Sequence, residues 1–243
     1  MAYVLASPIP EALGIRVFEK VSEIRNNPDI MQHADAIVRL LCEISEVTLN
    51  YYFLRPLDLI HAGNFGQRLV TMGIQTSVGL TRTTSGRLLR QMDSTQLLKF
   101  AQWVEDTIVI EQSGRYMLAC PVGPGDAEMV FEVVRKIRKN PVKHIHTDQT
   151  VNAAVEITRI SLNHFAIEPL NLMRVGAFGH KLVDMAIHAG LGILRMTGPK
   201  LVNPLEGEDL IAFAGFFEGL MVPVDQYSFQ KHFEVTSTRS NPS

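Results

Sequence analysis

The feature that most constrains this chain is a similarity between its two halves at a spacing of 113 residues. Shifting the sequence by 113 positions aligns residues 49–82 with 162–195 without a gap, and 14 of these 34 positions are identical, against about two expected by chance for an ordinary composition. The sequence therefore predicts a tandem duplication, with one helical repeat over 3–115, a second over 116–228 and a C-terminal tail over 229–243. Residues that lie 113 positions apart are called counterparts.

The spacing of apolar residues predicts four helices in each half. The first covers 11–26, with its counterpart at 124–139, because apolar residues recur at helical spacing until Asn27–Pro28 and Asn140–Pro141.

A second helix is predicted over about 35–54, with 148–167 as its counterpart, because Pro56 and Pro169 disfavour helical geometry in the residue before them. A third, over about 66–82, is apolar almost all round and is expected at the centre of the unit. An amphipathic fourth helix is predicted over about 93–110.

These elements predict an all-α fold, in which two four-helix units are related by a pseudo-two-fold axis. A short strand leading each repeat stays open as an addition, over Tyr3–Ser7 and Tyr116–Cys120.

The composition favours a packed globular protein and excludes some partners. Hydrophobic residues make up 46% and charged residues 20% of the chain, which is far from the signature of disorder. A net charge of -2 creates no field that attracts nucleic acid, so no nucleic-acid partner is expected.

A cytoplasmic location is expected, because the two cysteines, Cys42 and Cys120, form no paired motif and the first residues lack a secretory pattern. No transmembrane segment is predicted, since Glu218 interrupts the apolar run over 210–224.

One face of the third helix carries small residues in both halves. Glycine inside a helix costs about 1 kcal/mol relative to alanine, so their retention indicates a close approach to the backbone. We favour the third helix of the other half as the approaching group, and a flat or elongated apolar ligand is the alternative. The residues are Gly66, Gly73 and Ser77, with the counterparts Gly179, Ala186 and Gly190.

The fourth helix differs between the halves, because its polar stripe is replaced by small residues. Lys99, Gln102 and Asp106 have the counterparts Ala212, Gly215 and Gly219. The apolar run over 210–217, which includes Phe216, needs a cover in a soluble protein. We favour a homodimer contact at Ala212, Gly215, Phe216 and Gly219, with membrane-surface docking and burial against the first half as alternatives.

Among the eight histidines, only His33 and His146 are counterparts of each other. His33 and His146 are each followed two residues later by an acid, Asp35 or Asp148. We interpret the aspartates as caps of the second helix with the histidines beside them, and a metal or proton-transfer role is the less favoured alternative. No metal site is predicted.

The sequence contains none of the common nucleophile, dinucleotide, phosphate or zinc motifs. Packing is duplicated without duplicated chemistry, so the leading hypothesis is a non-enzymatic all-helical binding or regulatory protein that acts as a homodimer. The alternative is a carrier or enzyme that binds an apolar small molecule between the repeats. No cofactor or catalytic residue is assigned.

Overall fold

The computed structural model describes residues 2–59, 64–142, 145–173 and 177–224 of the chain. It is predominantly helical and contains one small sheet. In chain order, the elements are β1 (Tyr3–Pro8), α1 (Glu11–Asn26), α2 (Ile30–Leu49), the π-helical turn η1 (Asn50–Leu54), α3 (Arg55–Leu59), α4 (Asn64–Leu89), α5 (Ser94–Thr107), β2 (Ile108–Ile110), β3 (Tyr116–Val122), α6 (Pro124–Lys139), α7 (Thr147–Leu162), the π-helical turn η2 (Asn163–Ile167), α8 (Glu168–Leu172), α9 (Ala177–Val202), α10 (Gly207–Leu220) and β4 (Met221–Pro223).

The bounds of the second-half elements follow those of the first half. α6, η2, α8, α9 and α10 begin and end 113 residues after α1, η1, α3, α4 and α5. The first predicted helices, 11–26 and 124–139, match α1 and α6, because an apolar stripe and an Asn-Pro stop are both local signals. The predicted tail over 229–243 lies outside the described residues.

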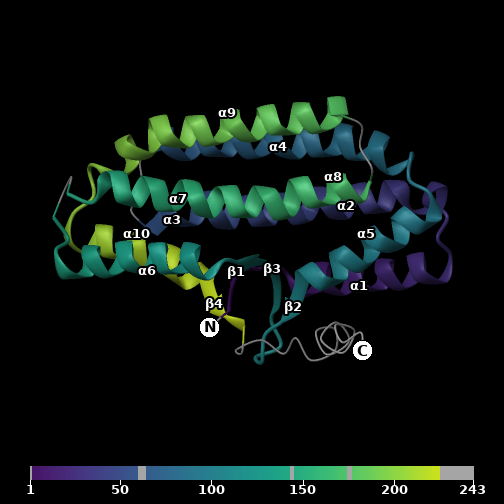
Figure 1. The fold of residues 1–243 in the computed structure, drawn as a ribbon, viewed down its shortest axis with the longest axis horizontal. Coiled ribbons are helices and arrows are strands. Elements are labelled where there is room, and N and C mark those ends of the chain that lie inside the picture. Colours follow the sequence, from purple (N-terminus) through teal and green to yellow (C-terminus); the bar gives the residue numbers. More distant parts are fainter. Residues whose placement is uncertain (1, 60–63, 143–144, 174–176, 225–243) are drawn as a thin grey trace, which may run out of the picture.

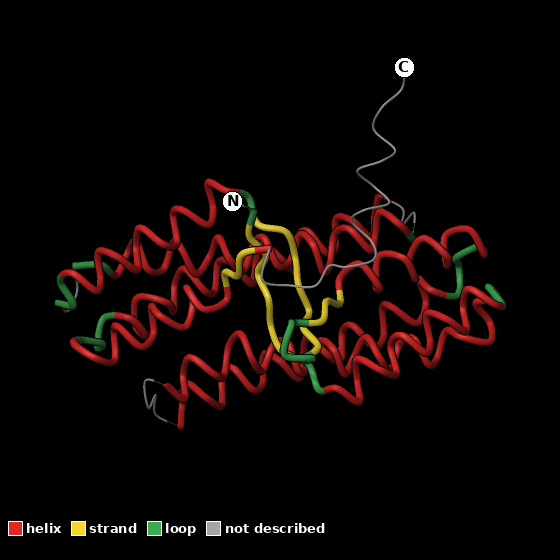
Figure 2. The backbone as a smooth tube through the Cα atoms, turned by 90° about the horizontal axis from the view of Figure 1, so that it is seen from below, coloured by secondary structure: helices red, strands yellow, loops and turns green. Residues whose placement is uncertain are grey.

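The helices form three layers (Figure 1). The long helices α4 and α9 make the top layer of that view, and α2, α3, α7 and α8 make the middle one. The lower layer has α6 and α10 on one side, α1 and α5 on the other, and the strands between them. Figure 2 shows the strands crossing the middle of the molecule, roughly perpendicular to the helices on either side.

The sheet is antiparallel, with the strand order β2-β3-β1-β4. At its centre Ala6 pairs with Ala119, its own counterpart. The outer pairs match as well, since Tyr3 pairs with Pro223 and the counterpart Tyr116 pairs with Ile110. Each of these residue pairs therefore becomes another pair of the same sheet when both residues are replaced by their counterparts.

The all-α prediction is therefore correct only in the predominance of helix. β1 and β3 cover the two segments that we expected as strands. β2 occupies 108–110, which the sequence assigned to the fourth helix; α5 ends at Thr107 instead. The apolar residues Ile108 and Val109 suit either state, and pairing with β3 decides in favour of the strand.

The second predicted helix, over 35–54, has the wrong start and does not end at the proline. α2 already begins at Ile30, where Asp29 caps it by accepting a hydrogen bond from the Met31 amide at 3.0 Å. At its other end the backbone widens into η1, whose closing bond runs from the Arg55 amide to the Asn50 carbonyl, and α3 follows directly.

Proline explains the widened turns. A proline inside a helix lacks an amide donor, and its ring clashes with the carbonyl four residues earlier. A π-helical turn displaces that carbonyl, so the chain stays helical through Pro56 and, after η2, through Pro169. The second-half prediction, 148–167, is correct to one residue at its start, because α7 begins at Thr147, and it needs the same correction only at its end.

Each helical core takes in segments of the other half. The cluster around α6, α7 and α10 includes Leu5 of β1 and Leu57 of α3. The cluster around α1, α2 and α5 includes Leu118 of β3, and Phe165 of η2 packs against it. Because α5 also packs on α8, and α10 on α3, neither half completes its core alone.

The third predicted helix is longer than expected and lies elsewhere. α4 covers 64–89 instead of about 66–82, and it belongs to an outer layer, with Met72 64% exposed (Figure 1). Within the described parts of the chain, no helix combines the length and the apolar character needed to cross a bilayer.

Candidate ligand-binding cavity

A cavity of about 460 Å³ lies between the two halves, and both contribute to its wall. The middle layer supplies residues of α2, η1, α7 and η2. Side chains of α4 and α9 close it on one side. The opposite side is closed by residues of α5 and α10 and by Ile108 and Leu118 on the inner face of the sheet.

Both π-helical turns contribute to the wall. Tyr52 and Phe53 come from η1, and Phe165 and Ala166 come from η2. A π-helical turn changes the direction in which side chains leave a helix, and such turns occur frequently at functional sites. The duplicated prolines thus shape the cavity through the turns that precede them.

The wall is apolar and uncharged. Among the described residues that line it, there is no Asp, Glu, Lys, Arg or His. Its largest side chains are aromatic, and most of the others are aliphatic. The polar exceptions are hydroxyl groups and the Trp103 indole: Ser45, Thr48, Thr81, Thr107, Thr158, Ser161 and Thr197 carry the aliphatic hydroxyls, and Tyr52 carries a phenol.

The hydroxyl groups on α2 and α7 are satisfied differently. On α7, Thr158 donates to the Ala154 carbonyl at 2.8 Å and Ser161 donates to the Ile157 carbonyl at 3.0 Å. On α2, the Oγ1 atom of Thr48 is buried without a hydrogen-bond partner among the described residues. Thr48 is the counterpart of Ser161, so at this position the hydroxyl is hydrogen-bonded in the second half and lacks a partner among the described residues in the first.

The volume is in the range of small-molecule sites. Ligand pockets typically measure about 300–1,000 Å³, and an engineered apolar cavity of about 150 Å³ holds benzene. Scaling from benzene, about 460 Å³ accommodates a molecule of roughly 18 non-hydrogen atoms.

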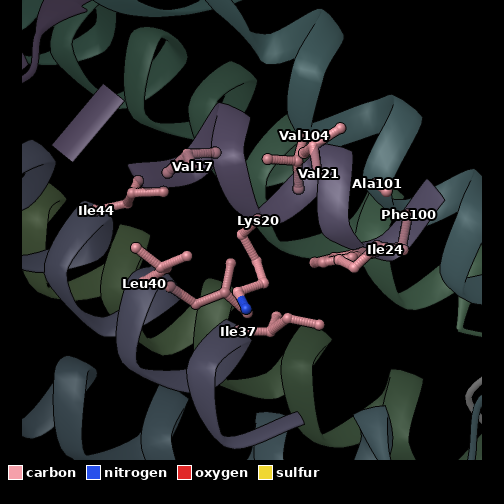
Figure 3. A pocket seen from close by; sticks show the side chains of 11 residues that line it. Val17, Lys20, Val21, Ile24, Ile37, Leu40, Ile44, Phe100, Ala101 and Val104 are labelled. Atoms are coloured by element: carbon pink, nitrogen blue, oxygen red, sulfur yellow. The ribbon is translucent and has the colours of Figure 1, made fainter. Parts of the chain in front are cut away.

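A second, much smaller pocket lies between α1, α2 and α5 (Figure 3). Its volume is about 30 Å³, little more than the space of one water molecule. Lys20 extends across it from α1 toward Ile37 of α2 (Figure 3), and its ammonium group pairs with Glu23 on the same helix. The counterpart of Lys20 is Val133, which is buried. We interpret this pocket as incomplete packing beneath a lysine stem.

One side of the cavity wall is anchored by a polar cluster. Trp103 reaches from α5 to the second half, where its Nε1 donates to the Glu168 carboxylate at 3.3 Å. The Nδ1 atom of His164 lies 2.7 Å from the same carboxylate oxygen. Burial lowers the pKa of His164, and the neighbouring Glu168 acts in the opposite direction.

The opposite side of the cavity has no such cluster. The counterparts of Trp103, His164 and Glu168 are Phe216, Tyr51 and Arg55, and the rings of Tyr51 and Phe216 lie 5.6 Å apart. Since His164 does not line the cavity, we interpret the cluster as a support for the Trp103 wall. The sequence shows that these three residues differ from their counterparts, but it does not show that α5 packs against α8.

His33 and His146 each contact a backbone carbonyl, and Asp35 and Asp148 do not cap the second helix as we interpreted them. His33 Nε2 lies 2.7 Å from the Asn27 carbonyl, and His146 Nε2 lies 2.8 Å from the Asn140 carbonyl. Both buried imidazoles therefore fasten the loop after the preceding helix.

The aspartates are exposed. Asp35 pairs with Arg90, whereas Asp29 caps α2. Asp148 lies in the first turn of α7, whose cap residue makes no side-chain bond. Among the described residues, no group of three His, Cys, Asp or Glu side chains is placed to hold a metal ion.

The small-residue face of the third helix is only partly described. Gly73 is exposed on α4, and a methyl group placed there would meet no atom within 4 Å. The surroundings of the other five positions lie outside what the structure describes, so the proposed contact is untested there: Gly66, Ser77, Gly179, Ala186 and Gly190.

The apolar run on α10 is largely covered by the chain itself. Leu210 and Phe213 are buried, and Phe216 is half-buried against Tyr51 of the first half. Of the remaining positions that we assigned to a dimer contact, Gly215 is half-buried, while Ala212 and Gly219 are exposed. The run therefore does not by itself require a partner.

Comparisons with models of known protein families, with curated proteins and with solved structures gave no match. Function is therefore inferred from the geometry and chemistry of the cavity.

Proposed function

We propose that this protein binds a neutral, largely apolar small molecule in the cavity between its halves, and that the halves are copies of one ancestral unit. The observation that carries the proposal is a volume of about 460 Å³ that is bounded by both halves and lined, in its described part, without any charged side chain.

The lining of the cavity favours an apolar ligand. Removing apolar surface from water is favourable by roughly 25 cal/mol per Å², and most of the described lining is aliphatic or aromatic. A ligand that fills the space gains this free energy on its own surface and on the wall.

Three observations support the duplication. The helix bounds repeat at a spacing of 113 residues, the sheet register is symmetric about Ala6 and Ala119, and α5 and α10 make equivalent contacts with the opposite half. A duplicated unit that cannot complete its own core gains stability from a second copy, and the cavity lies where the copies meet.

A homodimeric regulatory protein, the function that the sequence favoured, has less support. Its motive was an exposed apolar run over 210–217, but three of these eight residues are buried and four are half-buried within the chain. The remaining motive is the pair of small exposed residues Ala212 and Gly219. Light scattering checks it: a monomer at micromolar concentration, unchanged by Ala212→Arg, would refute the dimer.

The ligand proposal is tested by native mass spectrometry of the protein purified from its own host without organic solvent. We expect a native mass that exceeds the sequence mass by about 250 Da, from roughly 18 non-hydrogen atoms, and a loss of that excess on denaturation. The chain should also bind an uncharged naphthalene fluorophore. A native mass equal to the sequence mass, together with no binding of that fluorophore, would overturn the proposal.

A further inference from the structure

The outer helices α4 and α9 are positively charged, whereas the chain as a whole is slightly negative. Together they hold six Lys and Arg residues and a single acid, Asp184, a net charge of +5, although the whole chain has a net charge of -2. The cations occupy the same three positions in each half, so this charge pattern is duplicated. They are Arg68, Arg82 and Arg87 on α4, with the counterparts Lys181, Arg195 and Lys200 on α9.

The six cations lie on the sides of their helices that face away from the cavity. All six are exposed, and at 100° per residue the three positions on each helix fall within about 140° of one another. Val70 and Thr81 line the cavity from the opposite side of α4, and Leu194 does so from α9. Since α4 and α9 form an outer layer (Figure 1), their cationic faces point out of the molecule.

These cations lack the ion-pair partners that other surface cations of the chain have. Among the described residues, none of the six forms an ion pair. By contrast, Arg16 on α1 and Arg135 and Arg138 on α6 each pair with a glutamate. Uncompensated charge gathered on one face creates a field that attracts an anionic partner.

Exposed methionines lie among the cations. Met72 on α4 is 64% exposed and its counterpart Met185 on α9 is 60% exposed, each one helical turn after the first cation of its helix. Met196, next to Arg195, is 68% exposed. A helix face that combines cations with large apolar side chains is typical of helices that lie on an anionic bilayer. There the apolar side chains enter the lipid, and the cations reach the headgroups.

Other partners fit these faces less well. A second copy of the chain would bring two faces of like charge together. Nucleic acid would account for the cations but not for the methionines, and proteins hold single strands with aromatic side chains, none of which is exposed among the described residues. A bilayer presents the same headgroups over its whole surface, so both duplicated faces can bind it at once.

We propose that the outer faces of α4 and α9 dock on a membrane surface that contains anionic phospholipids. Each helix has 26 residues and is therefore about 39 Å long, which gives an extended contact surface. Because the inner faces of the same helices line the cavity, docking places the cavity one layer of helices away from the lipid. The inference goes beyond the ligand proposal and does not depend on it.

The test is cosedimentation of the full chain with vesicles of phosphatidylcholine mixed with phosphatidylserine, and with vesicles of phosphatidylcholine alone. Three triple variants remove the same charge from different helices. The α4 variant combines Arg68→Gln, Arg82→Gln and Arg87→Gln, and the α9 variant combines Lys181→Gln, Arg195→Gln and Lys200→Gln. The matched control combines Lys99→Gln, Lys136→Gln and Lys139→Gln, which are exposed on α5 and α6 in the lower layer.

We expect wild type to bind the mixed vesicles with an affinity that falls as salt is added, and to bind phosphatidylcholine vesicles far more weakly. Each cation near an anionic surface changes the affinity roughly fivefold, so the α4 and α9 variants should each bind about 100-fold more weakly. The control should bind nearly as tightly as wild type. Met72→Gln combined with Met185→Gln should also weaken binding, although it leaves the charge unchanged.

Three results would overturn the inference: no binding of wild type to the mixed vesicles, a control variant weakened as much as the α4 variant, or an α4 variant that binds as tightly as wild type. If wild type binds a fluorescein-labelled oligonucleotide but no vesicles, the cationic faces bind nucleic acid instead. The ligand proposal is tested separately, because the α4 variant should keep the wild-type affinity for the uncharged naphthalene fluorophore.

Discussion

Replacing Ala154 by leucine should stabilise the protein and weaken ligand binding at the same time. Ala154 lines the cavity from α7 and is half-buried, and its counterpart on α2 is Leu41, which lines the same cavity. The added side chain therefore enters space that is free of protein atoms, in a conformation that the other half already uses.

The magnitude follows from the three added carbon atoms. Burial contributes about 0.8 kcal/mol per carbon, or about 2.4 kcal/mol in total. Fixing the leucine side chain offsets about 0.5–1 kcal/mol, and partial exposure reduces the gain further. We expect a net increase in the free energy of unfolding of about 1–1.5 kcal/mol, or about 2–6 °C in Tm for a chain of this length.

Thermal unfolding and titration with the uncharged naphthalene fluorophore measure the two effects on the same sample. The matched control is Ala153→Leu, since Ala153 is only 5% exposed and belongs to the packed core around α7. Three extra carbons there overpack the core and should destabilise the protein by about 1–3 kcal/mol. Adjacent positions on one helix should thus respond to the same substitution with opposite signs.

The reasoning is refuted if Ala154→Leu lowers Tm as much as Ala153→Leu does, because the space beside Ala154 would then be filled by protein. It is also refuted if Ala154→Leu leaves the affinity for the fluorophore unchanged, because the fluorophore would then bind elsewhere.

Three further predictions concern stability. Asp93 forms a capping box with Gln96 at the start of α5, whereas its counterpart Glu206 makes no side-chain cap bond on α10. In denaturant titrations, Asp93→Ala should therefore lower the free energy of unfolding by about 1 kcal/mol, and Glu206→Ala should have little effect. His33→Ala and His146→Ala should each cost about 1 kcal/mol, because the Asn27 or Asn140 carbonyl loses its hydrogen bond to the imidazole; a loss of ligand binding at unchanged stability would contradict this structural role. Burial lowers the pKa of His164 below its ordinary value of 6.5, so near this pH the unfolded chain binds a proton more readily than the folded chain. The free energy of unfolding should therefore fall as the pH drops below about 6.5. His164→Tyr should flatten this pH dependence, and an unchanged dependence of stability on pH would contradict the prediction.

Some features could be predicted from the sequence because their causes are local. α1 and α6 need only an apolar stripe and an Asn-Pro stop, and both bounds were predicted correctly. The segments over 3–7 and 116–120 carry apolar residues ahead of a proline and were recognised as strand candidates. The spacing of 113 residues, read from the sequence alone, also matches the bounds of the later helices.

Other features depend on contacts between distant segments. Pro56 predicts a helix end, but packing around η1 keeps the chain helical and only widens one turn. The apolar run on α10 predicts a partner, but Tyr51, far away in sequence, covers Phe216. A single sequence contains no signal for these contacts between distant segments, because the burial of a residue depends on the surfaces packed against it and not on its own segment.

The sequence by itself determined most of the helical segments and the spacing of 113 residues at which similar residues recur, because helix propensity and apolar spacing act over a few residues. Only the tertiary structure decided that α5 and α10 pack on the opposite half, that two strands meet at Ala6 and Ala119, and that a cavity of about 460 Å³ remains between the halves. A cavity arises where large rigid elements cannot approach further, and that distance is set by every contact of the fold together.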